Sequence, residues 1–541
     1  MVMNINWKAG LDRSPWRPES VAPAAFATGN GIAYDARNDA SRIPLAFFYA
    51  NGGAFIFNPV VGDWFPIVTY SPASNGAGSA SVFHPSQGPG VGLLTGGSAA
   101  GIGNVASGTT TSIGLTTALP AAVGLNQLAD RGDGVGFRMR VIGFHAAGSG
   151  KTEEVTITAN TAGTTPTITF TPALTFTPAS GDGYEILSGK LYCLLNGALG
   201  TTTWRSIDIA TGLVTNLTNT NLAATIATDS FLLARPEVYV SNDRNPGDGF
   251  VDTGSTYNNA ASKCCIATAS STTTLTCAAL TAPATPSLAT NEYRNFQIRV
   301  VEDTGTPTAV GQRRNITSHT SGNTPVFTVP TFTVQPSATA KFVVEQNNDQ
   351  VLARTSATTN MYNYSVGGNA WDAATTWVAG GSGNGAGVMM APAFGITRDA
   401  SGNRLQGQIF VFKGGATATL DLFDTTGGAT GAWTAGITYG YSGQTFTTGT
   451  CGCYDPVTLG GKYFHISVEL GSLSPGRMAR FNVMTQTLEV GTYRPYPCSA
   501  GNPSAGQRMF VAYALDGTSK LANLYQMPSG IAPMFSQIVP V

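Results

Sequence analysis

The chain has 541 residues, of which only 11% are charged, against roughly 25% in an average soluble domain. The 29 lysines and arginines nearly balance the 30 aspartates and glutamates, which excludes a strongly basic surface that grips phosphates. A hydrophobic content of 42% excludes a disordered chain. The 66 glycines, together with abundant threonine, predict an almost entirely β-structured protein.

The predicted elements begin with an N-terminal arm at 1–40. Its first residues contain no apolar stretch typical of a secretory signal. The chain contains no run of 18 apolar residues, so we expect no membrane insertion. Trp7 and Trp16 lie in a polar, proline-containing setting and are candidates either for docking on a partner or for a strap over the rest of the chain. The segment 26–35, FATGNGIAYD, is expected to supply a strand that closes a ring with the C-terminus.

After the arm, one pattern recurs six times. An apolar strand and a polar turn are followed by a second strand that ends in an apolar residue and a small polar one, often followed by Gly and Trp. Once two inserts are left out, the repeats are spaced at about 45–75 residues, near the length of one β-propeller blade. The apolar–polar pairs are Phe57-Asn58, Ile207-Asp208, Tyr364-Ser365, Phe423-Asp424, Phe481-Asn482 and Tyr525-Gln526.

The two inserts resemble each other. Phe137, Arg140 and Val141 match Phe296, Arg299 and Val300, and a Thr-rich run precedes each copy, SGTTTSIGL and SSTTTLTCA. Alternating segments such as VTIT and FTVPTFTV predict strands with one buried face. We name these inserts module A (104–187) and module B (266–345).

The predicted fold is all-β, a six-bladed β-propeller with two inserted small modules of the β-sandwich or β-barrel kind. A set of separate β-sandwiches is the alternative. The predicted segments after the arm are blade 1 at 41–103, module A at 104–187, blade 2 at 188–265, module B at 266–345 and blades 3–6 at 346–541.

Two short motifs resemble known sites and receive other interpretations. The segment 147–152, AGSGKT, has the end of a phosphate-binding loop, but a strand pattern follows it where a helix is required. We therefore predict a hairpin turn there. Arg131-Gly132-Asp133 is an Arg-Gly-Asp tripeptide, a sequence that can bind integrins when it lies on an exposed loop. A sequence of three residues also occurs by chance, so we do not predict integrin binding from it.

The candidates for metal binding are weak. Asp243, Asn245, Asp248 and Asp252 lie in a Gly-rich loop that could hold Ca²⁺, although the spacing departs from the EF-hand and a plain turn explains it equally. The segment Cys451-Gly-Cys453 could chelate a soft metal with His465, but it lacks the spacing of a structural zinc site. We therefore predict no metal and no cofactor. The seven cysteines are an odd number and fit buried thiols in a reducing compartment.

Catalytic motifs are scarce. The chain has four histidines and no G-x-S-x-G elbow, so we do not expect an enzyme. Trp371 and Trp377 are candidates for stacking on sugars, with a core position as the alternative.

The modules resemble a segment that recurs in tailed-bacteriophage virion proteins. That segment has a Gly-x-x-Arg-x-Ile-Thr turn and strand, a Thr- or Val-rich strand, an aromatic residue and Pro, and a closing Tyr/Phe-x-Ile strand. Module B carries it at 311–344, GQRRNITSHTSGNTPVFTVPTFTVQPSATAKFVV, and module A carries it more loosely at 150–186, without the arginines. The rest of the chain is similar only in architecture to the propeller hubs, or nozzles, of short-tailed phages.

The resemblance implies a non-enzymatic structural component of a phage tail: a ring-forming nozzle, hub or adaptor through which DNA passes. Its expected partners are further copies of the chain and other tail or neck proteins. Its expected location is the virion tail, after synthesis in the host bacterial cytoplasm. The alternatives are a receptor- or glycan-binding propeller of a tail tip or fibre, and an extracellular carbohydrate-active enzyme.

Overall fold

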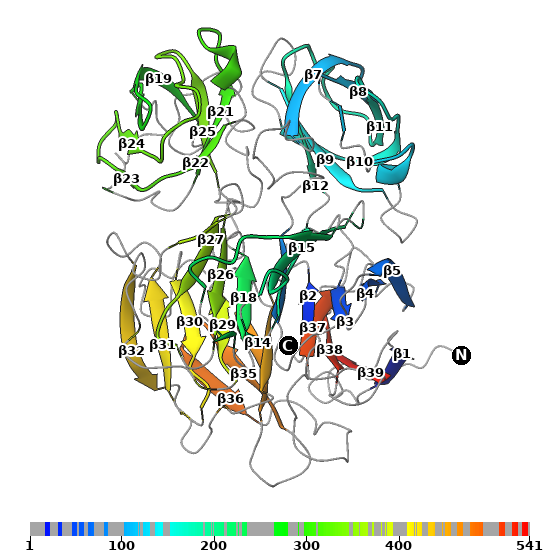
Figure 1. Ribbon diagram of the computed structural model, residues 1–541, viewed down its shortest axis with the longest axis vertical. Coiled ribbons are helices and arrows are strands. Elements are labelled where there is room, and N and C mark those ends of the chain that lie inside the picture. Colours follow the sequence, from blue (N-terminus) through cyan, green and yellow to red (C-terminus); the bar gives the residue numbers. More distant parts are fainter. Residues whose placement is uncertain are drawn as a thin grey trace.

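The computed structural model shows an all-β protein (Figure 1). It describes residues 17–538 except 22–30, 35–45, 70–79, 85–101, 130–135, 144–151, 235–263, 280–289, 291–296, 373–379, 393–407, 425–430, 439–445, 456–461, 469–476, 491–507, 514–521 and gaps of one to five residues. Two short 3-10 turns, η2 (Gln127–Ala129) and η7 (Pro307–Ala309), are the helical elements of the described part. No described helix has the length and hydropathy needed to cross a bilayer.

Twenty-four of the strands form six antiparallel sheets of four strands each, which we number sheets 1 to 6. Their strands, innermost first, are as follows. Sheet 1 contains β2 (Gly31–Tyr34), β3 (Ala46–Ala50), β4 (Gly53–Asn58) and β5 (Asp63–Thr69); sheet 2 contains β6 (Ala80–His84), β13 (Lys190–Leu194), β15 (Trp204–Asp208) and β16 (Val214–Asn216); sheet 3 contains β18 (Phe231–Ala234), β26 (Gln350–Arg354), β27 (Tyr362–Ser365) and β28 (Ala370–Trp371). Sheet 4 contains β29 (Met389–Pro392), β30 (Gln408–Phe412), β31 (Thr419–Asp424) and β32 (Ala432–Thr438); sheet 5 contains β33 (Cys451–Asp455), β34 (Tyr463–Val468), β35 (Arg477–Asn482) and β36 (Thr487–Val490); sheet 6 contains β37 (Arg508–Tyr513), β38 (Ala522–Met527), β39 (Pro533–Ile538) and β1 (Arg17–Val21). A separate pair joins β14 (Gly197–Ala198) to β17 (Thr225–Ile226).

The six sheets follow one another in a closed order. Contacts join β2 to β6, β6 to β18, β18 to β29, β29 to β33, β33 to β37, and β37 back to β2. Each sheet packs its faces against its two neighbours, because alternate residues of a strand point to opposite faces. In sheet 5, for example, Phe464 and Phe481 pack toward sheet 4, whereas Cys453 and Met478 pack toward sheet 6.

The repeated apolar–polar pair ends the third strand of sheets 1 to 5, whereas in sheet 6 it lies on the second strand, β38, one residue before the end of that strand. The apolar member faces a tryptophan on the next strand in three cases: Phe57 opposite Trp64, Tyr364 opposite Trp371 and Phe423 opposite Trp433. The ring centroids in these pairs are 5.1, 5.2 and 4.6 Å apart. Cross-strand aromatic pairs of this kind stabilise a sheet, which explains the repetition of the pattern.

One strand assignment from the sequence is wrong. The segment 26–35 does not complete the last sheet, because Gly31–Tyr34 within it pairs with β3 as the innermost strand of sheet 1. Sheet 6 is instead completed by β1, in which Arg17 lies opposite Ser536 and Pro18 opposite Phe535. Proline cannot donate to a sheet ladder, so Pro18 fits this outermost position.

The predicted boundaries of the first two blades also differ from the sheet boundaries. Strand β6 lies within 41–103 but pairs with β13 of sheet 2, and β18 lies within 188–265 but pairs with β26 of sheet 3. Each module is therefore inserted between the first and second strands of a sheet rather than between two sheets. The two insertion points are equivalent positions in consecutive sheets.

Module A is a closed six-stranded barrel in the order β10-β11-β8-β7-β12-β9. Module B has the corresponding order, β22-β21-β25-β19-β20-β24-β23, with the counterpart of β10 split into two short strands. The strands of module A are β7 (Ile102–Gly108), β8 (Ser112–Leu115), β9 (Arg138–Ile142), β10 (Thr152–Asn160), β11 (Thr167–Thr171) and β12 (Gly183–Leu187). Those of module B are β19 (Cys264–Ser270), β20 (Thr274–Cys277), β21 (Gln297–Glu302), β22 (Arg313–Asn315), β23 (Ser318–His319), β24 (Val326–Thr328) and β25 (Lys341–Glu345).

The Thr-rich runs that precede the repeats form the same turn in both modules. The hydroxyls of Thr109 and Ser112 lie 2.9 Å apart in module A, and those of Ser271 and Thr274 lie 2.8 Å apart in module B. In each case the first hydroxyl also accepts a hydrogen bond from a backbone N–H two residues later. Short side-chain hydrogen bonds of this type favour turns, so the turn follows directly from the run.

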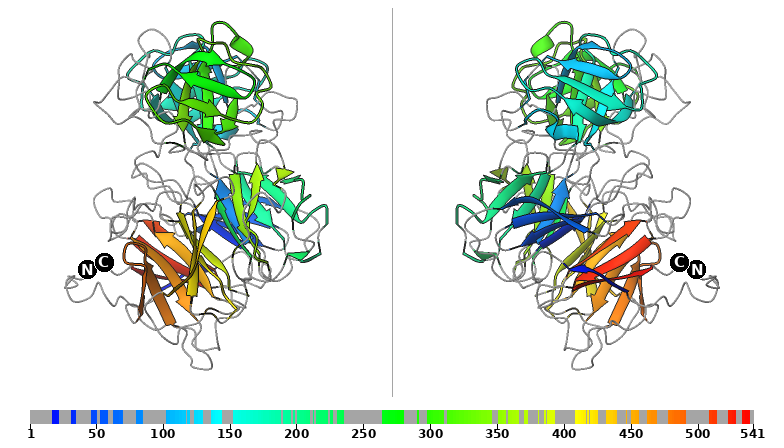
Figure 2. Two further views of the ribbon diagram at one scale, coloured as in Figure 1. Left: turned by 90° about the vertical axis from the view of Figure 1, so that its left-hand side faces the viewer. Right: turned by 90° about the vertical axis from the view of Figure 1, so that its right-hand side faces the viewer.

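The modules lie side by side on one side of the six sheets (Figures 1 and 2). Their cores continue into the sheets that carry them. Val105 and Ile186 of module A belong to the same cluster of contacting buried side chains as Leu191 of sheet 2. Phe342 of module B is joined in the same way to Leu352 of sheet 3. Each module core is thus continuous with the core of the sheet that carries it.

Candidate functional site

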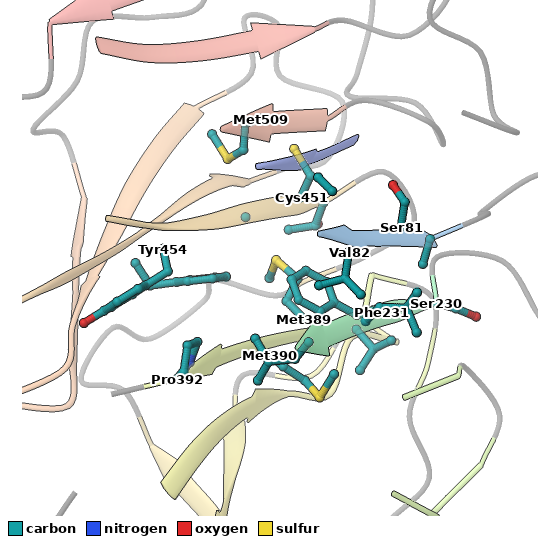
Figure 3. Close-up of a pocket in the computed structure, with 18 of the residues that line it drawn as sticks. Ser81, Val82, Ser230, Phe231, Met389, Met390, Pro392, Cys451, Tyr454 and Met509 are labelled. Carbon is teal, nitrogen blue, oxygen red and sulfur yellow. The ribbon is translucent and has the colours of Figure 1, made fainter. Parts of the chain in front are cut away.

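The innermost strands of all six sheets surround a central cavity of about 90 Å³ (Figure 3). Consecutive residues such as Ala80, Ser81, Val82 and Phe83 all line it, which indicates that the strands present their edges to the cavity. One lining residue from each innermost strand is Ala33 of β2, Val82 of β6, Phe231 of β18, Met389 of β29, Cys451 of β33 and Met509 of β37.

The edge of an innermost strand has backbone N–H and C=O groups that no further strand can pair. Buried backbone groups need a partner, and water is the usual one when protein groups are absent. A cavity of this size holds several water molecules. The geometry therefore suits a small hydrated channel.

The side chains around the cavity are apolar or carry hydroxyl groups. Ser81, Ser230, Thr450 and Tyr454 supply the hydroxyls, and no Asp, Glu, Lys, Arg or His stands among the described lining residues. The buried Ser81 hydroxyl has no hydrogen-bond partner within the described part of the chain. Tyr454 and Cys451 are the titratable side chains among the described lining residues.

Buried charges lie away from the cavity, between strands. Lys190 and Asp208 lie opposite each other in sheet 2, and both are 4% exposed. Burial lowers the pKa of Lys190, and the nearby Asp208 acts in the opposite direction. Arg354, Lys413 and Asp421 form a second group, at the junction of sheets 3 and 4. Neither group lines the cavity, so both serve the framework.

The sequence-predicted interaction residues divide into two groups. Trp371 is 2% exposed and packs against Trp204 and Tyr364 with ring centroids 4.9 and 5.2 Å away. The core alternative therefore holds, and the prediction that Trp371 stacks on a sugar is wrong. Trp7, Trp16 and Trp377, together with the calcium candidates Asp243, Asn245, Asp248 and Asp252, lie outside the described residues.

The short motifs are placed in part. Strands β9 and β10 on either side of 143–151 pair antiparallel, with Ile142 opposite Thr152. A strand, β10, thus follows where a phosphate-binding loop requires a helix, and the turn predicted for AGSGKT lies, except for Thr152, outside the described residues. Cys453 lies opposite His465, yet the described residues contain no group of three His, Cys, Asp or Glu side chains that could hold a metal. Arg131-Gly132-Asp133 falls outside the described residues.

The cavity was not predicted, because five of the six sequence repeats begin on the second strand of their sheet rather than on the innermost one. The innermost strands of sheets 2 and 3 are short apolar runs, SVF at 81–83 and FLL at 231–233, and a module separates each of them from the rest of its sheet. These runs resembled the ends of preceding units. The apolar runs themselves are visible in the sequence. The sheet to which each run belongs is decided by pairing between segments that lie far apart in the chain.

The cysteines whose side chains the structure describes are buried thiols, and Cys193 is one of them. Its burial raises its pKa, although nearby Arg205 acts in the opposite direction. Because the thiolate is the reactive form, we expect no alkylation of Cys193 by iodoacetamide at pH 8 in the folded protein and rapid alkylation in urea. Peptide mass spectrometry measures both. Labelling of the folded protein at the rate seen in urea would contradict this expectation.

Comparison with known proteins adds little. No family model matches the chain, and no curated protein matches it. A structural genomics protein of unknown function from Bacteroides thetaiotaomicron aligns at 9% identity and a TM-score of 0.21, over 44% of this chain and 64% of its own. An auxiliary nutrient binding protein from the same organism aligns at 12% identity and a TM-score of 0.22, over 80% of this chain and 82% of its own. Likenesses this weak carry no argument about function.

Proposed function

We propose that sheets 1 to 6 are the blades of a six-bladed β-propeller. The proposal rests on the closed order of contacts among the innermost strands and on the four-stranded antiparallel form of every sheet. The pairing of β1 with β39 joins the two ends of the chain within one blade. Such closure leaves the ring without a seam between the first and last blades.

We further propose that the protein is a non-enzymatic structural component of a phage tail, a ring-forming nozzle, hub or adaptor. The observation that carries this proposal is the pair of equivalent modules, inserted at the same position of consecutive sheets and projecting on one side (Figure 1). Modules that project from the same side of the sheets present contact surfaces to neighbouring copies, and symmetric rings are built from such repeated contacts. The resemblance of the modules to phage virion segments supports the same assignment.

Any DNA path would have to run between copies of the chain. The central cavity of about 90 Å³ is far too small for a duplex whose major groove alone is about 12 Å wide. Its described wall also lacks the lysines and arginines that would bind phosphates. A channel formed by a ring of near-neutral chains would let DNA move without holding it.

The competing functions have less support. The sugar-binding hypothesis loses Trp371, which lies in the core. The enzyme hypothesis needs acids that converge on a cleft, and the described cavity wall contains none. A structural role fits both observations.

Light scattering combined with negative-stain imaging tests the proposal. We expect the purified chain to form a closed ring whose mass is a multiple of 55.9 kDa. A matched variant replaces module B by a short Gly-Ser turn between β18 and β26, and its assembly is expected to weaken. A monomer at every concentration, together with binding to a glycan array, would contradict the tail-ring assignment and favour the glycan-binding alternative.

A further inference from the structure

Four sulfur-containing side chains meet between sheets 5 and 6. Cys451, Cys453, Met478 and Met509 belong to one cluster of contacting buried residues, which is completed by Val511 and Leu524. Their exposed fractions are 6%, 1%, 3% and 2%. Two thirds of this cluster is therefore thiol or thioether.

Strand geometry explains the convergence. Cys451 and Cys453 are two residues apart on β33, so their side chains point to the same face of sheet 5. Ser467 lies opposite Cys451, and Met478 lies opposite Ser467 on the strand beyond. Met509 comes from β37, the strand of sheet 6 that contacts β33. Three strands of two sheets thus contribute sulfur-containing side chains to one contacting cluster.

The cluster is reached from the central cavity. Cys451 and Met509 both line that cavity, and Figure 3 shows their side chains next to each other on one wall. An ion that enters the cavity would meet these two side chains. Met478 and Cys453 lie behind them in the same cluster.

We propose that this cluster is a binding site for a soft monovalent metal ion, Cu(I), held by the Cys451 thiolate and the Met509 and Met478 thioethers, with Cys453 as a further sulfur ligand. Thiolate and thioether ligands select Cu(I) over harder ions. Binding replaces the thiol proton of Cys451, which leaves to solvent, so that one thiolate and one Cu(I) form a neutral pair. A neutral pair avoids the cost of burying a net charge.

The same chemistry disfavours zinc. Zinc sites use thiolate, imidazole and carboxylate ligands, and the described residues contain no group of three such side chains. Two of the four sulfurs here are thioethers, which are neutral and weak ligands for zinc. The composition of the cluster therefore discriminates between the two metals.

Anaerobic competition with bicinchoninate, using Cu(I) and the full chain under a thiol-free reductant, tests the proposal. We expect the wild type to hold one equivalent of Cu(I) that the Cys451→Ala variant lacks. The Met509→Leu variant, which removes a ligand but conserves volume, is expected to bind at least about tenfold more weakly. X-ray absorption of the loaded protein is expected to show sulfur as the nearest neighbour of copper.

The matched control is Met389→Leu. Met389 lines the same cavity but packs in the cluster between sheets 4 and 5, so its loss is expected to leave Cu(I) binding unchanged. All variants are made in a Cys498→Ser background, because the structure does not describe the placement of Cys498 and its thiol could bind Cu(I) separately. The proposal is overturned if the wild type holds no copper, if Cys451→Ala and Met509→Leu bind like the wild type, or if Met389→Leu weakens binding equally. Should Cys451→Ala fail to fold, Met509→Leu alone decides.

Discussion

Replacing Asp421 by alanine is expected to lower the free energy of unfolding by about 3–5 kcal/mol, the range for breaking a buried ion pair. Asp421 is fully buried, and its Oδ1 lies 3.3 Å from the Lys413 ammonium nitrogen. The backbone N–H of Gly436 donates to the same oxygen over 2.9 Å. Removal of the carboxylate leaves the Lys413 charge in the interior.

A second cation makes the loss larger. Arg354 of sheet 3 is fully buried, and burial lowers its pKa to about 10, while Asp421 and Tyr362 act to raise it. The guanidinium carbon lies 4.9 Å from the Trp433 ring centroid. Asp421 therefore balances charge from two sheets, and its loss affects the junction between sheets 3 and 4.

Urea denaturation followed by tryptophan fluorescence and by circular dichroism measures this effect. Asp421→Asn keeps an acceptor for the Gly436 N–H but not the charge. Its free energy of unfolding is expected to decrease less than that of Asp421→Ala. Thr434→Ala, on the exposed side of the next strand, is the matched surface control and is expected to stay within about 0.5 kcal/mol. An Asp421→Ala protein as stable as that control would show that the ion group does not stabilise the junction.

Replacing Trp204 by alanine is expected to cost about 3–5 kcal/mol, the range for deleting a large aromatic side chain from a core. Trp204 is fully buried. Its ring centroid lies 5.5 Å from that of Tyr192, 5.1 Å from Tyr364 and 4.9 Å from Trp371. The four rings join sheet 2 to sheet 3, so the cavity left by alanine would open at that junction.

The Trp204→Phe variant separates packing from hydrogen bonding. The Trp204 indole N–H has no hydrogen-bond partner within the described part of the chain, so phenylalanine is expected to lose ring contacts but no hydrogen bond. The decrease in the free energy of unfolding of Trp204→Phe is expected to be less than half that of Trp204→Ala in the same denaturation experiment. Equal losses for both variants would mean that the indole nitrogen has a role that the packing does not explain.

Local patterns in the sequence predicted much of the fold. The pair Phe423-Asp424 marks the end of a third strand because an aromatic residue there meets a tryptophan on the following strand. The Thr-rich runs predicted the module turns because hydroxyl hydrogen bonds act over two or three residues. Such signals depend on neighbours in the chain, which a sequence displays directly.

Features that depend on distant segments were not predictable. Nothing local to Gly31–Tyr34 or Arg17–Val21 shows which of the two pairs with β39. Asp421 interacts electrostatically with Arg354, 67 positions earlier, and no periodicity relates the two. The sulfur cluster was visible only as Cys451-Gly-Cys453, because Met478 and Met509 join it through sheet packing.

The position of the modules has a consequence for the order of folding. Strand β6 must pair with β13 across an intervening module, as must β18 with β26. A long flexible loop makes such pairing entropically costly and slow, but a folded barrel holds its two ends at fixed positions. Modules A and B should therefore fold before sheets 2 and 3 can form. Sheets 1, 4 and 5, made of consecutive strands, have no such requirement and are expected to nucleate the rest of the ring.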